Sequence, residues 1–110
     1  MKVEAVNGLI KILKAEAEVC TFPTNVFNNA CGEEGVPNFM VRDERYAVAV
    51  ADAFSRVSNG KRFGVCSVMG GLNPAGTQMA YGALAQAYED SSPFLCLTDG
   101  VPAGSMGRPM

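Results

Sequence analysis

Apolar residues recur along the chain with two different periods, and segments of the two kinds alternate. Residues 6–17 carry apolar side chains at the i, i+3, i+4, i+7 spacing of an amphipathic helix. The next apolar segment, residues 19–22, is short and rich in β-prone side chains, and Pro23 ends it. The pattern therefore predicts a helix, a strand and then a loop.

The middle of the chain repeats this alternation. Residues 25–34 are predicted as a short helix that stops at Gly35, and residues 39–41 as a second strand. A longer helix follows, with Asp43 as its N-cap and an Asn-Gly turn at its end. We expect its apolar face to consist of Ala47, Val50, Ala51, Phe54 and Val57.

The second half contains two further strands. Residues 63–69 are almost continuously apolar, which predicts a strand buried on both faces. A loop rich in glycine, residues 70–76, leads into a helix whose apolar face is expected to hold Ala80, Ala83, Leu84, Ala87 and Tyr88. A fourth buried strand is predicted at residues 94–97, and residues 99–110 show no periodic pattern and are expected to form a loop or tail.

Strands that alternate with helices at this spacing indicate βαβ units and a mainly parallel sheet with helices on both faces. We therefore predict an α/β fold, a flavodoxin-like three-layer sandwich with about four strands. The domain is expected to cover residues 1–100, with residues 101–110 as a tail. Because the chain ends just after a strand that reads as central, we expect the sheet to be incomplete.

Size and composition narrow the function classes. A chain of 110 residues is one domain, and 48% hydrophobic and 18% charged residues are typical of a folded globular protein. The net charge of −2 comes from mixed acids and bases, which argues against nucleic-acid binding. No apolar segment approaches the roughly 20 residues that span a bilayer, and the N-terminus lacks the apolar core of a secretory signal. We expect a cytoplasmic protein.

The residue inventory also limits the chemistry. Histidine is absent, which excludes nucleophiles activated by His and most zinc and iron sites built on imidazole. The four cysteines are widely spaced and contain no CxxC pair, so we expect reduced thiols that pack as small apolar side chains; they are Cys20, Cys31, Cys66 and Cys96. Acid–base chemistry must come from carboxylates, lysine, tyrosine, cysteine or a bound cofactor.

Three loops follow the first three predicted strands and share the carboxyl edge of a parallel sheet, where ligands bind. They contain Pro23 with Thr24, Glu44, and the glycine loop at residues 70–76. Glu44 is either an ordinary acid at a helix start, favoured by the helix dipole, or the reactive group of a ligand site. The glycines allow either a tight turn or a close approach to a flat ligand, and the loop matches neither a Walker P-loop nor GxGxxG.

The order RDERYAVAVADAFSRV, NGKRFGVCSV, a Gly/Pro loop and GALAQAYEDSSPFLCLTDG resembles the pyrimidine-binding domain of thiamine diphosphate enzymes, most closely acetolactate synthase and its relatives. The resemblance covers residues 9–100. It implies an enzyme that acts on 2-oxo acids by decarboxylation or carboligation. It also implies that Glu44 hydrogen-bonds the aminopyrimidine N1′ and favours the imino tautomer, whose 4′-nitrogen removes the C2 proton of the thiazolium ring.

The same resemblance places further residues near the aminopyrimidine of thiamine diphosphate. They are Pro23, Thr24, Gly71, Asn73, Pro74 and Met79. Two departures from the family pattern affect these assignments. Thr24 replaces a common glycine, and the glycine loop is several residues longer than in acetolactate synthase, with Met79 aligned to the usual asparagine.

Members of this family hold the diphosphate and Mg²⁺ on a different domain, through a GDG motif that this sequence lacks. The resemblance therefore implies a half-site with no metal ligands of its own, inactive without a diphosphate-binding domain or subunit, in a homo-oligomer. Two other readings stay open at this point. The chain could be a non-catalytic α/β interaction module, or an unrelated flavodoxin-like anion or nucleotide binder that uses the glycine loop.

Overall fold

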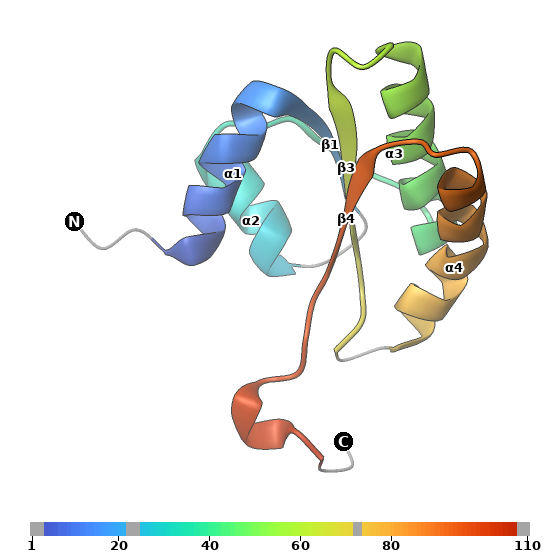
Figure 1. Ribbon diagram of the computed structural model, residues 1–110. Helices are drawn as coiled ribbons and strands as arrows, with labels where there is room; N and C mark the ends of the chain where they lie inside the picture. The colour runs from blue at the N-terminus through green and yellow to red at the C-terminus, as the bar shows by residue number, and fades with distance from the viewer. Residues whose placement is uncertain (1–3, 22–24, 72–73, 108–110) are drawn as a thin grey trace.

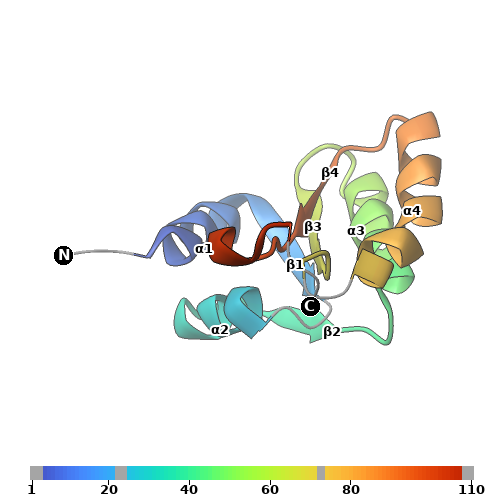
Figure 2. The same ribbon diagram turned by 90° about the horizontal axis from the view of Figure 1, so that it is seen from below.

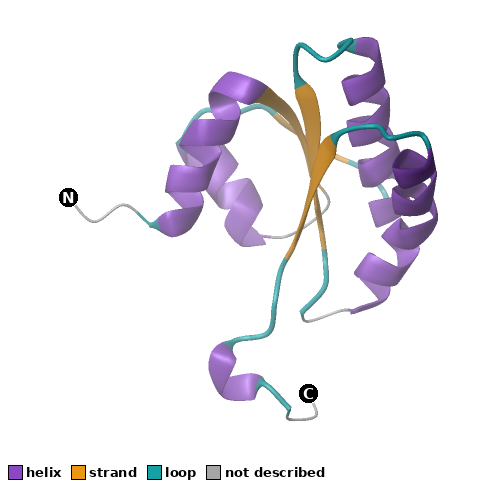
Figure 3. Ribbon diagram, in the orientation of Figure 1, coloured by secondary structure: helices purple, strands orange, loops and turns teal. Residues whose placement is uncertain are grey.

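The computed structural model describes residues 4–21, 25–71 and 74–107, and helices and strands alternate throughout (Figures 1 and 3). The elements predicted from the sequence pattern agree with them to within one or two residues at most ends. In chain order they are α1 (Ala5–Glu16), β1 (Ala17–Thr21), α2 (Asn25–Glu33), β2 (Asn38–Met40), α3 (Glu44–Val57), β3 (Phe63–Val68), α4 (Pro74–Glu89), β4 (Phe94–Thr98) and one 3₁₀ turn, η1 (Ala103–Ser105).

The four strands form one parallel sheet in the order β2-β1-β3-β4. Helices α1 and α2 lie on one face of the sheet, and α3 and α4 lie on the other (Figures 1 and 2). This arrangement confirms the predicted α/β sandwich with a flavodoxin-like strand order. Because all strands run the same way, their carboxyl ends meet at one edge, the lower edge in Figure 1.

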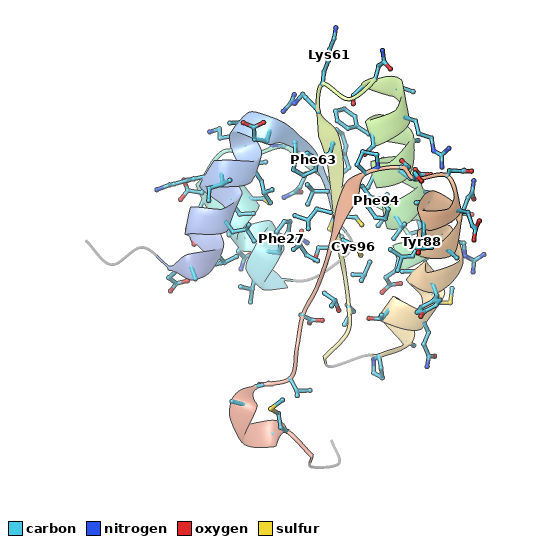
Figure 4. The ribbon with its side chains drawn as sticks, in the orientation of Figure 1. Phe27, Lys61, Phe63, Tyr88, Phe94 and Cys96 are labelled. Atoms are coloured by element: carbon cyan, nitrogen blue, oxygen red, sulfur yellow. The ribbon has the colours of Figure 1, made fainter. Side chains whose placement is uncertain are left out.

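Strand β3 joins the two hydrophobic cores. Val65 packs into the cluster beneath α1 and α2, while Cys66 and Val68 belong to the cluster beneath α3 and α4. Every residue of β3 after Phe63 is buried, as the continuous apolar pattern predicted. Figure 4 shows the two layers through Phe27 on α2 and Tyr88 on α4, which lie on opposite sides of the sheet.

Helix α3 begins and ends where the sequence predicted, and Ala47 and Ala51 of the predicted face are buried, but the rest of the buried face differs. The Asp43 carboxylate accepts a hydrogen bond from the Tyr46 amide at 3.1 Å, the expected N-cap. Val50 and Val57, predicted to be buried, are 45% and 81% exposed. The buried face consists of Glu44, Ala47, Val48, Ala51, Asp52 and Ser55.

The close approach of α3 to β3 explains this difference. A Cβ added at Gly64 would lie 2.0 Å from the Ala51 carbonyl oxygen, so helix and strand touch at their backbones. The Ser55 hydroxyl accepts a hydrogen bond from the Gly64 amide at 2.8 Å and donates one to Ala51 O at 3.0 Å. Such contact requires small side chains, so the alanine face packs on the sheet and the valines at 50 and 57 stay outside.

Two other burial predictions are wrong for reasons of position. Tyr88 is 83% exposed, because α4 presents Ala80 and Ala87 to the sheet and leaves the tyrosine ring outside. Strand β4 is only half-buried, since it is the last strand of the described sheet and has a neighbour on one side only.

An ion-pair network ties α3 to the end of α4 at the edge of the sheet opposite the carboxyl ends. Arg56 contacts Asp52, four residues earlier on the same helix, at 2.9 Å, and Asp90 at 2.8 Å. Burial opposes ionisation of Asp52, but the hydrogen bond and positive charge of Arg56 outweigh it and lower the pKa of the carboxyl.

No helix in the described ranges has both the length and the apolar character that crossing a membrane requires. The cytoplasmic location stays a prediction from the sequence.

Candidate functional site

The strand order places the candidate site at the carboxyl ends of β1 and β3. In an open parallel sheet, ligands bind where successive connections leave in opposite directions, and in the order β2-β1-β3-β4 this switch point lies between β1 and β3. The residues that follow β3 are Met69, Gly70 and Gly71. Pro23 and Thr24, which follow β1, lie outside the described residues, as does Asn73.

Glu44 lies at the carboxyl end of β3, although it follows β2 in sequence. It is the first residue of α3 and only 6% exposed. A Cβ added at Gly76 would lie 2.5 Å from Glu44 Oε1 and 2.5 Å from the Met69 carbonyl oxygen. The structure therefore brings together the second and third predicted loops, with the glutamate packed against the first turn of α4.

The Glu44 side chain is almost entirely buried. Within the described part of the chain, it forms no hydrogen bond or ion pair. The carboxyl is therefore available to a ligand that binds at this edge of the sheet.

Asp99 fixes the glycine loop from the neighbouring strand. Its Oδ1 atom accepts hydrogen bonds from the amides of Gly70 and Gly71, at 2.5 and 3.1 Å. A Cβ added at Gly71 would lie 2.3 Å from the carbonyl carbon of Gly100. These glycines therefore allow the loop to pack against the end of β4. Sequence reasoning missed Asp99, although an acid directly after a strand at the same edge was a usable signal.

A threonine holds the start of α4 to the end of β3. The Thr77 hydroxyl donates a hydrogen bond to Met69 O at 3.0 Å and lies 3.4 Å from the Thr98 hydroxyl. Together with Asp99, this contact joins β3, α4 and β4 around the Glu44 carboxyl.

The remaining sequence-predicted site residues occupy different surroundings. Pro74 is the first residue of α4 and is exposed. Met79 is 41% exposed and lines a surface groove between α3 and α4 with Arg45 and Tyr46, outside the contact of Glu44 with Gly76. Among the described residues, no three Cys, Asp or Glu side chains gather in a group that could hold a metal ion.

Comparison with known proteins agrees with this geometry. The family described as "Thiamine pyrophosphate enzyme, N-terminal TPP binding domain" matches residues 4–110. A probable acetolactate synthase large subunit of Methanocaldococcus jannaschii is 34% identical over 107 residues, 93% of this chain. An acetolactate synthase of Arthrospira platensis is 40% identical over 72 residues, 66% of the chain.

The chain spans only 17% and 12% of the length of these two relatives. The family match, in contrast, extends over almost the whole chain. The chain therefore belongs to the family of N-terminal thiamine pyrophosphate-binding domains.

Proposed function

We propose that this chain forms the pyrimidine-binding half of a thiamine diphosphate site, in an enzyme that acts on 2-oxo acids by decarboxylation or carboligation. The observation that carries the proposal is the buried carboxyl of Glu44, which has no partner among the described residues and lies at the carboxyl edge of the sheet. The family match and the acetolactate synthase relatives support it.

Glu44 is the proposed acid–base residue. Its carboxyl would hydrogen-bond the N1′ ring nitrogen of the aminopyrimidine and hold the proton shared between them. Shielding from water strengthens such a hydrogen bond, and aspartate would be too short by one methylene. When bound, thiamine diphosphate supplies the carbon nucleophile and the electron sink for chemistry at the carbonyl of the 2-oxo acid.

The other proposed pyrimidine contacts come from the loops after β1 and β3. We assign them, by resemblance to the family, to Pro23, Thr24, Gly71, Asn73, Pro74 and Met79. The amide contacts of Asp99 with Gly70 and Gly71 support a fixed loop beside the ligand. Met79 has the least support, because it lines the outer groove of α3 and α4.

We further propose that the diphosphate and its Mg²⁺ are held by another domain or subunit, and that this chain alone is inactive. The absence of a GDG motif from this sequence and the short share of each relative that the chain spans both support this division.

The outer face of α3 and α4 is the proposed contact surface for a partner subunit. Its exposed apolar side chains are Tyr46, Val50, Val57, Met79, Tyr81 and Tyr88. An exposed apolar surface of this kind favours association. We expect Tyr81→Glu to lower the sedimentation coefficient of the assembly, whereas Ile12→Glu, on the exposed face of α1, should leave it unchanged. Equal effects of the two variants would contradict this assignment.

The reading as an anion binder at the glycine loop has little support. The amides of Gly70 and Gly71, which would hold the anion, already donate to the Asp99 carboxylate. A second negative charge beside Asp99 would also be repelled. The alternative that the chain is a non-catalytic interaction module is tested by the proton-exchange experiment below.

The test is C2-proton exchange of thiamine diphosphate with Mg²⁺, the chain and the diphosphate-binding domain of an acetolactate synthase, followed by NMR. We expect exchange with the native chain and a loss of about 10²-fold or more with Glu44→Gln, the usual range for a proton-transfer group. Glu89→Gln, on the exposed end of α4, is the matched control. Undiminished exchange with Glu44→Gln would refute the role of Glu44, and no acceleration by the native chain would favour the non-catalytic reading.

A further inference from the structure

Two cysteines stand directly opposite each other on neighbouring strands. Cys66 of β3 and Cys96 of β4 are register partners in the parallel sheet. Both belong to the core cluster beneath α3 and α4, so their side chains lie on the same face of the sheet. Neither forms a disulfide in the described part of the chain, and Figure 4 labels Cys96 on β4.

This placement meets the Cα–Cα distance requirement of a disulfide. Neighbouring strands lie about 4.7–4.9 Å apart, within the Cα–Cα range of roughly 4.4–6.8 Å found for disulfides. In-register side chains on one face do not diverge, which places the two sulfurs side by side. Closing the bond needs only a small movement of the half-buried edge strand β4.

We propose that Cys66 and Cys96 form a redox-active dithiol that hydrogen peroxide oxidises to an intramolecular disulfide. The proposal does not depend on the function proposed above. The two cysteines lie three residues before Met69 and Asp99 on the strands that carry the candidate site, so the disulfide would restrain the strands that hold it.

Cys96 is the attacking thiol, because it is the more exposed of the two. The hydrogen bond from Cys66 also lowers the pKa of Cys96, against the opposing effect of burial. The Cys96 thiolate attacks one peroxide oxygen, which gives a sulfenic acid and a hydroxide that takes up the proton released from the thiol. Cys66 then attacks the Cys96 sulfur, and a second water leaves. Two thiols lose two electrons, and one peroxide becomes two waters.

The other cysteines define the controls. Cys31 is on α2, in the other core cluster, and burial raises the pKa of its thiol despite a hydrogen bond with Asn38. Cys20 is the backbone register partner of Cys66 on β1. A test must therefore separate a link between Cys66 and Cys96 from a link between Cys66 and Cys20.

Tryptic digestion separates these outcomes, because the chain has no lysine or arginine between Arg62 and Arg108, and Pro109 follows Arg108. One peptide, residues 63–110, therefore contains Cys66 and Cys96, and another, residues 15–42, contains Cys20 and Cys31. After brief peroxide treatment, alkylation and digestion without reductant, we expect peptide 63–110 to lose two hydrogens and take up no alkylating group. Dithiothreitol should restore both thiols, and peptide 15–42 should be alkylated twice.

Cys96→Ala is the matched variant, with circular dichroism as a check that it folds. It should abolish the intrapeptide disulfide and reduce peroxide consumption to the level of isolated buried thiols. If it fails to fold, the pattern of links in the native chain still decides the question. Full alkylation of peptide 63–110 after peroxide treatment, or a link between the two peptides, would overturn the proposal.

Discussion

The contact of Glu44 with the first turn of α4 predicts a specific defect in the Gly76→Ala variant. The added methyl would lie 2.5 Å from Glu44 Oε1, 2.5 Å from Met69 O and 2.9 Å from Met69 Cβ. Two of these atoms belong to Met69, which follows β3 directly and whose carbonyl is fixed by Thr77, so the Glu44 carboxyl is the group that must move. The variant should therefore displace the proposed catalytic carboxyl and strain the core.

Gly82→Ala provides the matched control, since it makes the same change in the same helix with no atom within 4 Å of the new Cβ. Replacing glycine by alanine inside a helix stabilises it by up to about 1 kcal/mol, and this gain should appear at Gly82. Overpacking a core typically costs about 1–3 kcal/mol, and this penalty should outweigh any gain at Gly76. Because the helix gain applies to both variants, we expect them to differ by the overpacking penalty of about 1–3 kcal/mol in free energy of unfolding.

Urea denaturation measures this difference, and thermal melting checks it, since 1 kcal/mol corresponds to a shift of roughly 4–8 °C in a domain of this size. Glu44→Asp, combined with Gly76→Ala, tests the cause. Shortening the acid should recover part of the loss, and the two changes should be non-additive because the residues are in contact. If Gly76→Ala proves as stable as Gly82→Ala, the packing of Glu44 on α4 described here is wrong.

Three further predictions follow from other contacts. Gly64→Ala should destabilise the fold by about 3 kcal/mol or more, because its methyl meets the Ala51 backbone at 2.0 Å; a urea midpoint equal to the native one would contradict this. Because pairing with Arg56 lowers the pKa of Asp52, the ion pair contributes fully to the free energy of unfolding at neutral pH and loses that contribution below about pH 4. Arg56→Gln should therefore make the free energy of unfolding depend less on pH below about pH 4. Asp99→Ala should speed hydrogen exchange of the Gly70 and Gly71 amides, whereas Asp99→Asn, which keeps an acceptor oxygen, should speed it less.

The sequence predicted the order and type of the elements because each carries a strong local signal. Asp43 caps the start of α3 as expected. After the end of α3, Asn59 and Gly60 adopt positive φ angles of 52° and 77°, as in a turn that ends a helix. The choice of buried face on α3 was not predictable in this way. Alanines and valines occur on several faces of that helix. Which face is buried depends on Gly64, a residue distant in sequence that lets the helix backbone approach the sheet.

In the candidate site, too, some features follow from the local sequence and others depend on residues far apart in the chain. Position at a strand-to-helix corner was enough to single out Glu44. The amide contacts of Asp99, in contrast, depend on the pairing of β3 with β4, which joins residues 28 and 29 positions apart. Such a contact appears only when the strand order is known.

The structure also weakens the alternative explanation of Glu44 as an ordinary acid at a helix start. That function is already performed by Asp43, whose side chain accepts the Tyr46 amide. A carboxylate that only interacts favourably with the helix dipole can do so from an exposed position. Burial gives such a carboxylate no advantage, because the loss of hydration is unfavourable for a charged group. Glu44 is nevertheless buried, against a glycine that leaves room for its oxygen. Because Asp43 already caps the helix, the burial of Glu44 supports the ligand-binding role that we propose for it.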